Sequence, residues 1–386
     1  MIHHSHLNTA VRILDSYRGG QPFALFIREF FKADKKYGSR DRKQISRLCY
    51  AFFRLGLLAG DRDTKDRILL GIFLGTAEEE VFPDGLQPGW SGAFGLPFAD
   101  KCLLAGISYS AEAHFPMVGQ LTGQIDQPVF TRSHFIQPDL FIRIRPGKKE
   151  SLYAKLSAAG IGFREIPPSA LAFPNSTNIE QVIIADTDAV IQDYSSQGVA
   201  GFFPDTGGRK LKVWDSCAAS GGKSILFLDH AGQADLTVSD LRQNILYNLQ
   251  QRFERAGIRD YRSLVVDLGT SAALSKGLRA FDFIIADVPC SGSGTWGRTP
   301  EHLRFFTPEK LEHYTLLQKK IVGNSLPALS PGGHYLYITC SVFRAENEEA
   351  VEYISSQGLQ PVRSGYIKGY GEKADTLFAA LFRKPD

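Results

Sequence analysis

Two cysteines in similar surroundings are the residues of this sequence best suited to chemistry. Cys290 lies in the motif DVPCSGSGT, and Cys340 lies in the motif YITCS. Each follows an apolar run typical of a buried strand, at residues 281–286 and 334–338 respectively. Because open parallel sheets carry their chemistry at the carboxyl ends of the strands, we expect both thiols at one sheet edge. A thiolate there could attack a bound substrate covalently.

A glycine-bearing turn precedes both cysteines. The apolar strand LKVWD at 211–215 runs into the segment CAASGGKS, where two adjacent glycines allow a ligand to approach the backbone. The end of this segment resembles a phosphate-binding P-loop, but that loop requires a glycine where Cys217 stands. A nucleoside triphosphatase is therefore disfavoured. We predict a cofactor turn made of Cys217, Ala218, Ala219, Ser220, Gly221, Gly222 and Lys223.

Acidic residues close the strands expected around this turn. Asp240 ends the run at 234–240, where an acid in nucleotide-binding sheets accepts ribose hydroxyls. Asp267 ends the run at 263–267, and Asp287 ends the next one. A single acid at a strand end is usually a helix cap or a turn residue. Three in succession, after a glycine turn, favour a cofactor site.

The remaining cysteines carry no such signal. Cys49 and Cys102 are best explained as packing residues, and we assign Cys217 to packing within the turn. The chain has no CxxC pair, so we expect neither a disulfide framework nor a metal site. Lys223 and Arg298 are the cations most suited to stabilise a thiolate.

Composition places the chain among ordinary globular proteins. It has 386 residues, 43% hydrophobic content and a formal net charge of +3, which neither demands nor excludes a nucleic-acid partner. We find no apolar run of membrane-spanning length and no signal-peptide pattern at the N-terminus. We therefore expect a reduced, cytoplasmic, monomeric enzyme without membrane contact.

The pattern along the chain predicts three parts. Apolar residues at helical spacing indicate helices over 7–60, and the Gly- and Pro-rich stretch at 75–130 is read as loop with some helix. A strand at 141–145, a helix at 151–160 and a strand in IGFREIP predict a small α+β unit, followed by a helix-prone lead-in at 190–203. From Gly207 onward, strand, turn and helix alternate, which predicts a doubly wound, parallel α/β sheet closed by a strand at 376–384. The predicted domains are 1–134, 135–190 and 191–386.

Several motifs match a known family in order and spacing. CAASGGK, VSDL, VVDL, DVPCSGSGT and TCSVFRAENEE resemble the motifs of the RNA cytosine-C5 methyltransferases, the RsmB/NSUN superfamily, from about residue 135 to the end. Upstream, AVRILDSYRGG and GSRDRKQISRLCYAFFRLG are similar to the NusB-like helical domain of its bacterial 16S rRNA members. The resemblance implies a Rossmann-like methyltransferase sheet, preceded by an RRM-like α+β unit and a NusB-like helical domain.

The resemblance also implies a cofactor and roles for the site residues. S-adenosylmethionine would be bound with its methionine end at the turn, its ribose at Asp240 and its adenine near Asp267. Asp287 would lie between the cofactor and the target base. Cys340 would be the nucleophile that attacks the C6 carbon of cytosine, and Cys290 would assist product release.

RNA is the partner that the resemblance implies. Ser220 stands where the family usually has proline, which predicts a looser turn, and TWGRTPEHL replaces a more basic stretch. The substrate expected is 16S rRNA, with tRNA as the alternative; a non-catalytic RNA-binding or ribosome-assembly factor is a further alternative. Basic residues between Lys32 and Arg47 could contact phosphates, or form an ordinary solvated helix face. The expected RNA contacts are Arg143, Arg145, Gln192, Asp193 and Arg298.

Overall fold

The computed structural model describes residues 2–76, 89–270 and 277–386. Its residues group into two compact units. The first, which we call the helical unit, comprises Met1–Leu121, Asp126–Gln137 and Thr295–Pro308. The second, which we call the sheet unit, comprises Thr122–Ile125, Pro138–Gly294 and Glu309–Asp386. Part of the predicted stretch at 75–130 lies outside the described residues.

The helical unit is built on amphipathic helices. The helices predicted over 7–60 are confirmed, and they bury apolar side chains such as Ile13, Phe23 and Ile45 in one core. The sequence did not predict the helix α4, because Arg67 to Leu74 are all buried and the run lacks a polar face. The helices are α1 (Ile2–Ser16), α2 (Phe23–Ala33), α3 (Ser39–Phe53), α4 (Thr64–Gly75), α5 (Phe98–Leu104), α6 (Ala111–His114), α7 (Gln127–Ser133) and α12 (His302–Phe305).

The segment Thr295–Pro308 packs with these helices, although the sequence placed it in the domain 191–386. Trp296 is fully buried and stacks on Phe115, with 5.0 Å between ring centroids. Buried Arg54 donates a 3.0 Å hydrogen bond to the Gly297 carbonyl. These contacts join residues far apart in the sequence, which is why local patterns did not reveal them.

The sheet unit begins with a small antiparallel sheet in the order β2–β3–β1–β4. Helix α8 (Lys149–Ala158) packs Leu152 and Leu156 against it, as the predicted α+β unit requires. The predicted lead-in at 190–203 begins instead in a strand, and the helix α9 (Tyr194–Gly198) follows it. An RRM-like identity stays a prediction. The strands are β1 (Leu140–Ile144), β2 (Arg164–Ile166), β3 (Ala170–Phe173) and β4 (Ala189–Ile191).

A seven-stranded sheet forms the rest of the unit, in the order β10–β11–β9–β8–β5–β6–β7. The parallel α/β sheet is thus confirmed, except that β11 runs antiparallel to both neighbours. The sequence missed the strand β10, which is an exposed edge strand with few apolar residues. The strands are β5 (Leu211–Asp215), β6 (Ala234–Asp240), β7 (Tyr261–Val265), β8 (Phe281–Asp287), β9 (Leu329–Thr339), β10 (Gln360–Lys368) and β11 (Thr376–Arg383).

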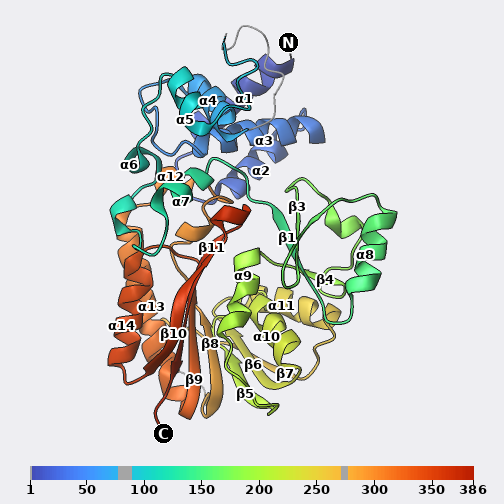
Figure 1. Cartoon of the computed structure of the whole chain (residues 1–386), viewed down its shortest axis with the longest axis vertical. Helices are drawn as coiled ribbons and strands as arrows, with labels where there is room; N and C mark the ends of the chain where they lie inside the picture. Colours follow the sequence, from blue (N-terminus) through green and yellow to red (C-terminus); the bar gives the residue numbers. More distant parts are fainter. Residues whose placement is uncertain (1, 77–88, 271–276) are drawn as a thin grey trace. The chain divides into compact units, whose positions relative to one another are not determined.

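Helices cover both faces of this sheet (Figure 1). α10 (Gly222–Ala231) and α11 (Gln243–Arg255) pack in one apolar core, and α13 (Pro308–Ser325) and α14 (Glu348–Ser356) pack in the other. The carboxyl ends of β5, β6, β8 and β9 are therefore left to carry polar residues, and they meet at one edge. That edge holds the candidate site.

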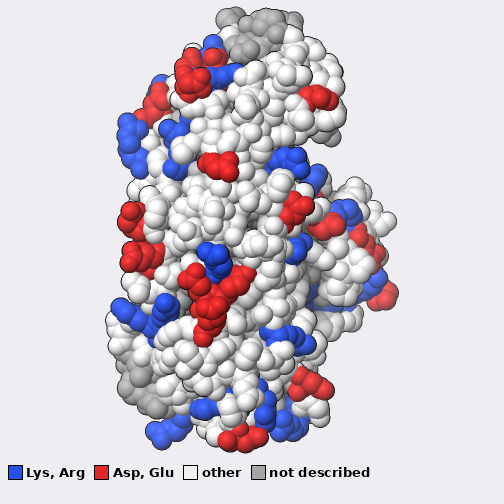
Figure 2. Space-filling model, turned by 60° about the vertical axis from the view of Figure 1, so that its left-hand side comes forward, with Lys and Arg blue, Asp and Glu red and all other residues white. Residues whose placement is uncertain are grey.

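Charges of both signs are mixed on the molecular surface. On the face shown in Figure 2, Lys and Arg side chains alternate with Asp and Glu, without a continuous basic band among the described residues. No helix in the described part of the chain is long and apolar enough to span a membrane.

Candidate active site

The two thiols lie side by side at the carboxyl edge of the large sheet. The Sγ atoms of Cys290 and Cys340 are 3.3 Å apart, and the backbone N–H of Cys340 points at the Cys290 sulfur, also at 3.3 Å. Cys340 directly follows β9, and Cys290 follows β8, which is parallel to β9. Both residues are partly exposed, whereas Cys49 and Cys102 are buried. The pair is therefore placed to act on a ligand.

Serine hydroxyls join the loops that carry the two cysteines. Ser293 Oγ accepts a 2.9 Å hydrogen bond from the Val342 N–H and lies 3.1 Å from Ser341 Oγ. The Gly294 N–H donates to the Cys340 carbonyl at 2.9 Å. These bonds connect the two loops across fifty residues of sequence. The distance between the thiols is thus fixed by a buried polar network rather than by the strands alone.

Gly294 gives a prediction, because the chain passes very close to it. A Cβ atom at this position would lie 2.0 Å from the Thr376 carbonyl oxygen and 3.1 Å from that of Cys340. Gly294→Ala should therefore displace the loop of Cys290, lower the stability by about 1–3 kcal/mol and reduce turnover more than cofactor binding. Thermal unfolding and single-turnover rates measure both effects. Gly371→Ala is the control, since its Cβ would meet nothing within 4 Å; equal behaviour of the two variants would contradict the prediction.

Lys223 links the cofactor turn to the thiol edge. Its Nζ donates to Asp287 Oδ2 at 3.0 Å and to Ser196 Oγ at 2.9 Å. Burial alone would lower the pKa of Lys223, but the charges of Asp287 and Cys340 more than offset this and hold it above its ordinary value. The ammonium group is thus a fixed positive charge on the Cys340 side of the pair. The sequence proposed this cation but could not place it.

The two sulfurs lie in different electrostatic surroundings. The hydrogen bond with Cys340, burial and the negative charges around it raise the pKa of the Cys290 thiol well above its ordinary value. Cys340 lies instead in the field of Lys223. The raised pKa of Cys290 favours its protonated form, and the assignment of Cys340 as the nucleophile stays a prediction.

The predicted cofactor turn is tightly built. Asp240, at the end of β6, accepts a 3.1 Å hydrogen bond from the Ala219 N–H. Gly221 has φ +84°, and a Cβ there would lie 2.5 Å from the Phe253 ring. Ser220 was expected to loosen the turn, but Arg252 Nη1 donates to both its carbonyl (3.1 Å) and its hydroxyl (3.0 Å). The turn is therefore anchored to α11 despite the missing proline.

Two further acids lie near this edge in different settings. Asp267 was expected to end a strand, but β7 ends at Val265. The sequence misplaced this end because the exposed edge strand has no clear alternation of apolar and polar residues. Asp267 accepts from the Gly269 N–H at 2.8 Å, as a turn residue does, so its contact with a cofactor stays a prediction. Asp215, at the end of β5, is buried; burial raises its pKa to about 7 against the opposing hydrogen bond from Ser224.

Four of the five residues predicted to contact RNA lie in the sheet unit, and they make protein contacts. Arg143 is buried and pairs with Asp229 at 2.6 Å, and its Nε donates to Gln192 Oε1 at 2.9 Å. Arg145 pairs with the other oxygen of Asp229 at 3.0 Å. Asp193 caps α9 through the Ser195 N–H. Their contact with RNA stays a prediction.

The fifth residue, Arg298, is half-buried in the helical unit and hydrogen-bonds through its N–H to Thr295. Because the cysteines belong to the sheet unit, the structure does not assign Arg298 to the thiol pair.

Sequence reasoning missed three buried polar residues that hydrogen-bond to the segments carrying the two cysteines. Glu346 and Asn347 are fully buried, and Gln318 on α13 is nearly so. Asn347 accepts from Thr339 Oγ1 at 2.6 Å and donates to the Ser341 carbonyl at 2.8 Å, so it clamps both neighbours of Cys340. The available signal was the Glu-Asn pair in TCSVFRAENEE, polar residues directly after the cysteine motif.

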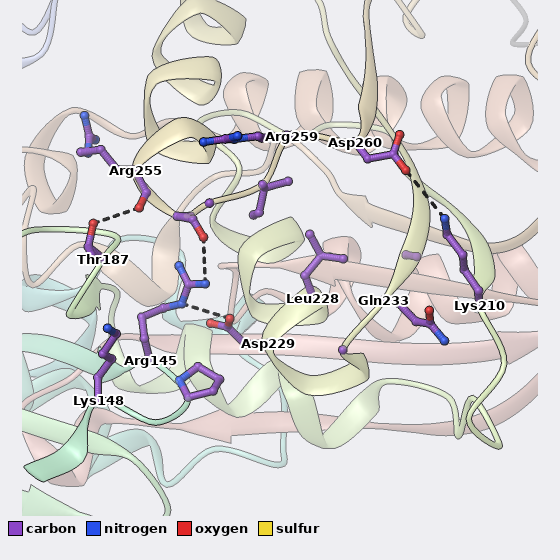
Figure 3. A pocket seen from close by; sticks show the side chains of 16 residues that line it. Arg145, Lys148, Thr187, Lys210, Leu228, Asp229, Gln233, Arg255, Arg259 and Asp260 are labelled. Carbon is purple, nitrogen blue, oxygen red and sulfur yellow. Dashed lines mark hydrogen bonds and ion pairs between the residues drawn. The ribbon is translucent and has the colours of Figure 1, made fainter.

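A hollow lies at the opposite edge of the sheet, before β5, β6 and β7 (Figure 3). It is lined by basic side chains, but most of them are paired with acids. Arg255 contacts Asp186 at 2.9 Å, and Lys210 lies 3.7 Å from Asp260. This hollow contains no thiol, so it is separate from the candidate active site.

Comparison with known families agrees with this geometry. Residues 207–364 match the family model described as 16S rRNA methyltransferase RsmB/F. The match covers less than half of the chain. The matched range includes the predicted cofactor turn, both cysteines and Glu346.

The chain is also similar to the ribosomal RNA small subunit methyltransferase B of Xylella fastidiosa (strain 9a5c). It is 30% identical over 258 residues, which cover 65% of this chain and 60% of the relative. The chain thus spans about three fifths of the length of that relative.

Solved structures share the fold. The crystal structure of PH0851 matches with a TM-score of 0.69 and 18% identity, covering 97% of each chain. A methyltransferase homolog protein from Pyrococcus horikoshii matches with a TM-score of 0.58 and 20% identity, covering 74% of this chain and 98% of that one. At these identities the likeness concerns the fold alone.

Proposed function

We propose that this chain is an S-adenosylmethionine-dependent RNA methyltransferase that methylates the C5 carbon of a cytosine, with 16S rRNA as the substrate. The observation that carries the proposal is the pair of thiols 3.3 Å apart beside the Lys223–Asp287 ion pair. Two thiols serve a reaction in which one adds to the base and the other helps to release it. A cofactor turn on the same sheet edge supplies the second substrate.

The residues around the turn fit the cofactor. Asp240 is a buried carboxylate beside the turn, suited to the ribose hydroxyls. Oδ1 of Asp215 is buried without a hydrogen-bond partner among the described residues, and the amino group of a methionine is the kind of donor that it lacks. Gly222 leaves the backbone open, since a Cβ there would meet nothing closer than 3.9 Å. When bound, S-adenosylmethionine supplies an electrophilic methyl group.

The side chains at the thiol pair then have separate roles in the reaction of the base. The C5 carbon of cytosine is a poor nucleophile until a thiolate adds at C6, which makes C5 enamine-like. Cys340 makes that bond, and negative charge then develops on the ring toward N3. Asp287 accepts a hydrogen bond from Lys223, and the ammonium group of Lys223 supplies a positive charge that stabilises this developing negative charge. After methyl transfer, the C5 proton passes to solvent water, the C5–C6 double bond re-forms and Cys340 leaves C6 as a thiolate, and Cys290 assists this release.

The RNA must deliver an unstacked base to this edge. The helical unit offers exposed cations at the end of α2 and along α3, where Arg40, Lys43 and Arg47 follow one another at helical spacing. We infer that these side chains contact phosphates, which predicts a binding constant that falls steeply with salt.

Bisulfite mapping of cellular RNA tests the proposal. In cells that lack the gene, one cytosine of 16S rRNA should lose its protection from conversion, and the gene on a plasmid should restore it. A Cys340→Ala copy should fail to restore it. Loss of a protected cytosine in tRNA instead would reassign the substrate, and unchanged protection in all RNA would contradict the methyltransferase proposal.

A further inference from the structure

Glu346 is a buried carboxylate directly behind the loop of Cys290. It follows Cys340 by six residues and is fully buried. Oε1 accepts hydrogen bonds from the Ser291 N–H at 2.8 Å and from Gln318 Nε2 at 2.9 Å. Oε2 accepts from the Ser291 hydroxyl. All three donors point at the carboxylate, so both of its oxygens have hydrogen-bond partners in this buried position.

The same network fixes the backbone on both sides of Cys290. Gln318 Nε2 also donates to the Pro289 carbonyl at 3.0 Å, so it bridges Glu346 and the residue before the cysteine. Glu346 itself accepts a hydrogen bond from the N–H of Ser291, the residue after the cysteine. The Glu346 carbonyl in turn accepts from the Tyr337 hydroxyl at 2.9 Å, which ties the carboxylate to β9. Cys290 therefore lies between two anchored neighbours: Pro289 is bonded to Gln318, Ser291 is bonded to Glu346, and Gln318 also donates to Glu346.

We propose that Glu346 is a positioning residue that fixes Cys290 against Cys340 and keeps the proton of the thiol pair on Cys290. This inference rests on the proposed function, because it assigns opposite protonation states to the two sulfurs before Cys340 adds to the base. A negative charge behind Cys290 disfavours a second negative charge on its sulfur, while Lys223 favours one on Cys340.

The other groups around Cys290 do not take over this role. The titratable side chains that face it are Cys340, Glu346, Tyr314 on α13 and Tyr337 on β9, with the Lys223–Asp287 pair beside Cys340. Burial raises the pKa of both tyrosines, so their hydroxyls stay neutral near neutral pH. Glu346 is thus the carboxyl group whose charge acts on Cys290.

The test measures the ionisation of Cys290 without RNA or cofactor. In the Cys340→Ala background, which removes the partner sulfur, iodoacetamide labels Cys290 at a rate that follows its thiolate fraction. Peptide mass spectrometry reports this cysteine separately from Cys49, Cys102 and Cys217. Adding Glu346→Gln should move the midpoint of the pH–rate curve down by about one unit, because it removes the charge and keeps the shape.

Glu349→Gln is the matched control. It is the same chemical change three residues later, at an exposed carboxylate that lies 3.9 Å from Arg344. It should leave the midpoint unchanged, and thermal unfolding should show all variants to be folded. An unchanged midpoint in a folded Glu346→Gln protein would overturn the proposal.

A second readout separates this inference from the proposed function. With Cys340 intact, Glu346→Gln should slow single-turnover methylation at least about tenfold, because a thiolate at Cys290 opposes the one at Cys340. Glu349→Gln should retain the parental rate. If the parental protein methylates no RNA but the alkylation midpoint still shifts, the proposed function fails and the role of Glu346 stands. If methylation is normal and Glu346→Gln changes neither readout, the role of Glu346 fails alone.

Discussion

Cys340→Ala should abolish methyl transfer while leaving S-adenosylmethionine bound as tightly as before. The thiolate of Cys340 makes C5 reactive, and Cys290 cannot replace it, because burial and the charge of Glu346 still raise the pKa of Cys290 when the Cys340 sulfur is gone. The single-turnover rate should fall at least about a thousandfold, which corresponds to about 4 kcal/mol. Rapid-quench assays with methyl-labelled cofactor measure the rate, and calorimetry measures the binding.

A cysteine remote from the site provides the control. Cys102 is buried in the helical unit, where its thiol packs with apolar side chains. Cys102→Ala should keep the parental rate at temperatures below its unfolding transition. Residual turnover of Cys340→Ala within tenfold of the parental enzyme would show that the nucleophile is wrongly assigned.

Cys290→Ala should trap a covalent complex between the protein and its RNA. The Cys340 thiolate still adds to the base and the methyl group is still transferred, but the step that breaks the bond to Cys340 loses its assistant. The complex should survive denaturing electrophoresis as a slower band that contains both RNA and label, while multiple turnover falls about a hundredfold. The band should be absent when Cys340 is also changed to Ala.

The opposite result would also be informative. If Cys290→Ala turns over normally without a slower band, release does not depend on Cys290. If the band forms in the double variant, the covalent bond is not made by Cys340. Either result would contradict the proposed roles of Cys340 as the nucleophile and Cys290 as the residue that assists release.

Much of the sheet unit could be predicted from sequence because its strands are strongly apolar and end in polar residues. β5, β6 and β8 lie where the apolar runs indicated, and they bring Asp240 and Asp287 to the predicted edge. Local patterns failed where an element is exposed on both faces or buried all round. The exposed strand β10 and the helix α4, which is buried from Arg67 to Leu74, both lack the alternation on which sequence reading depends.

The site was predictable to the extent that its chemistry lies in contiguous motifs. Cys290 and Cys340 could be paired because both follow apolar strands of one sheet. Glu346, Gln318 and Ser196 could not be identified, because their roles depend on hydrogen bonds to residues 27–55 positions away. The distribution of protons between the two thiols is likewise a property of the folded environment.

Mass spectrometry of a trapped complex tests the central claim most directly. A substrate RNA that carries 5-fluorocytidine at the target position retains fluorine at C5, so the proton-loss step cannot occur and the adduct persists. After nuclease and protease digestion, the methylated fluorocytidine should be attached to the peptide that contains Cys340. Attachment to the Cys290 peptide, or recovery of both peptides unmodified after complete methyl transfer, would contradict the account.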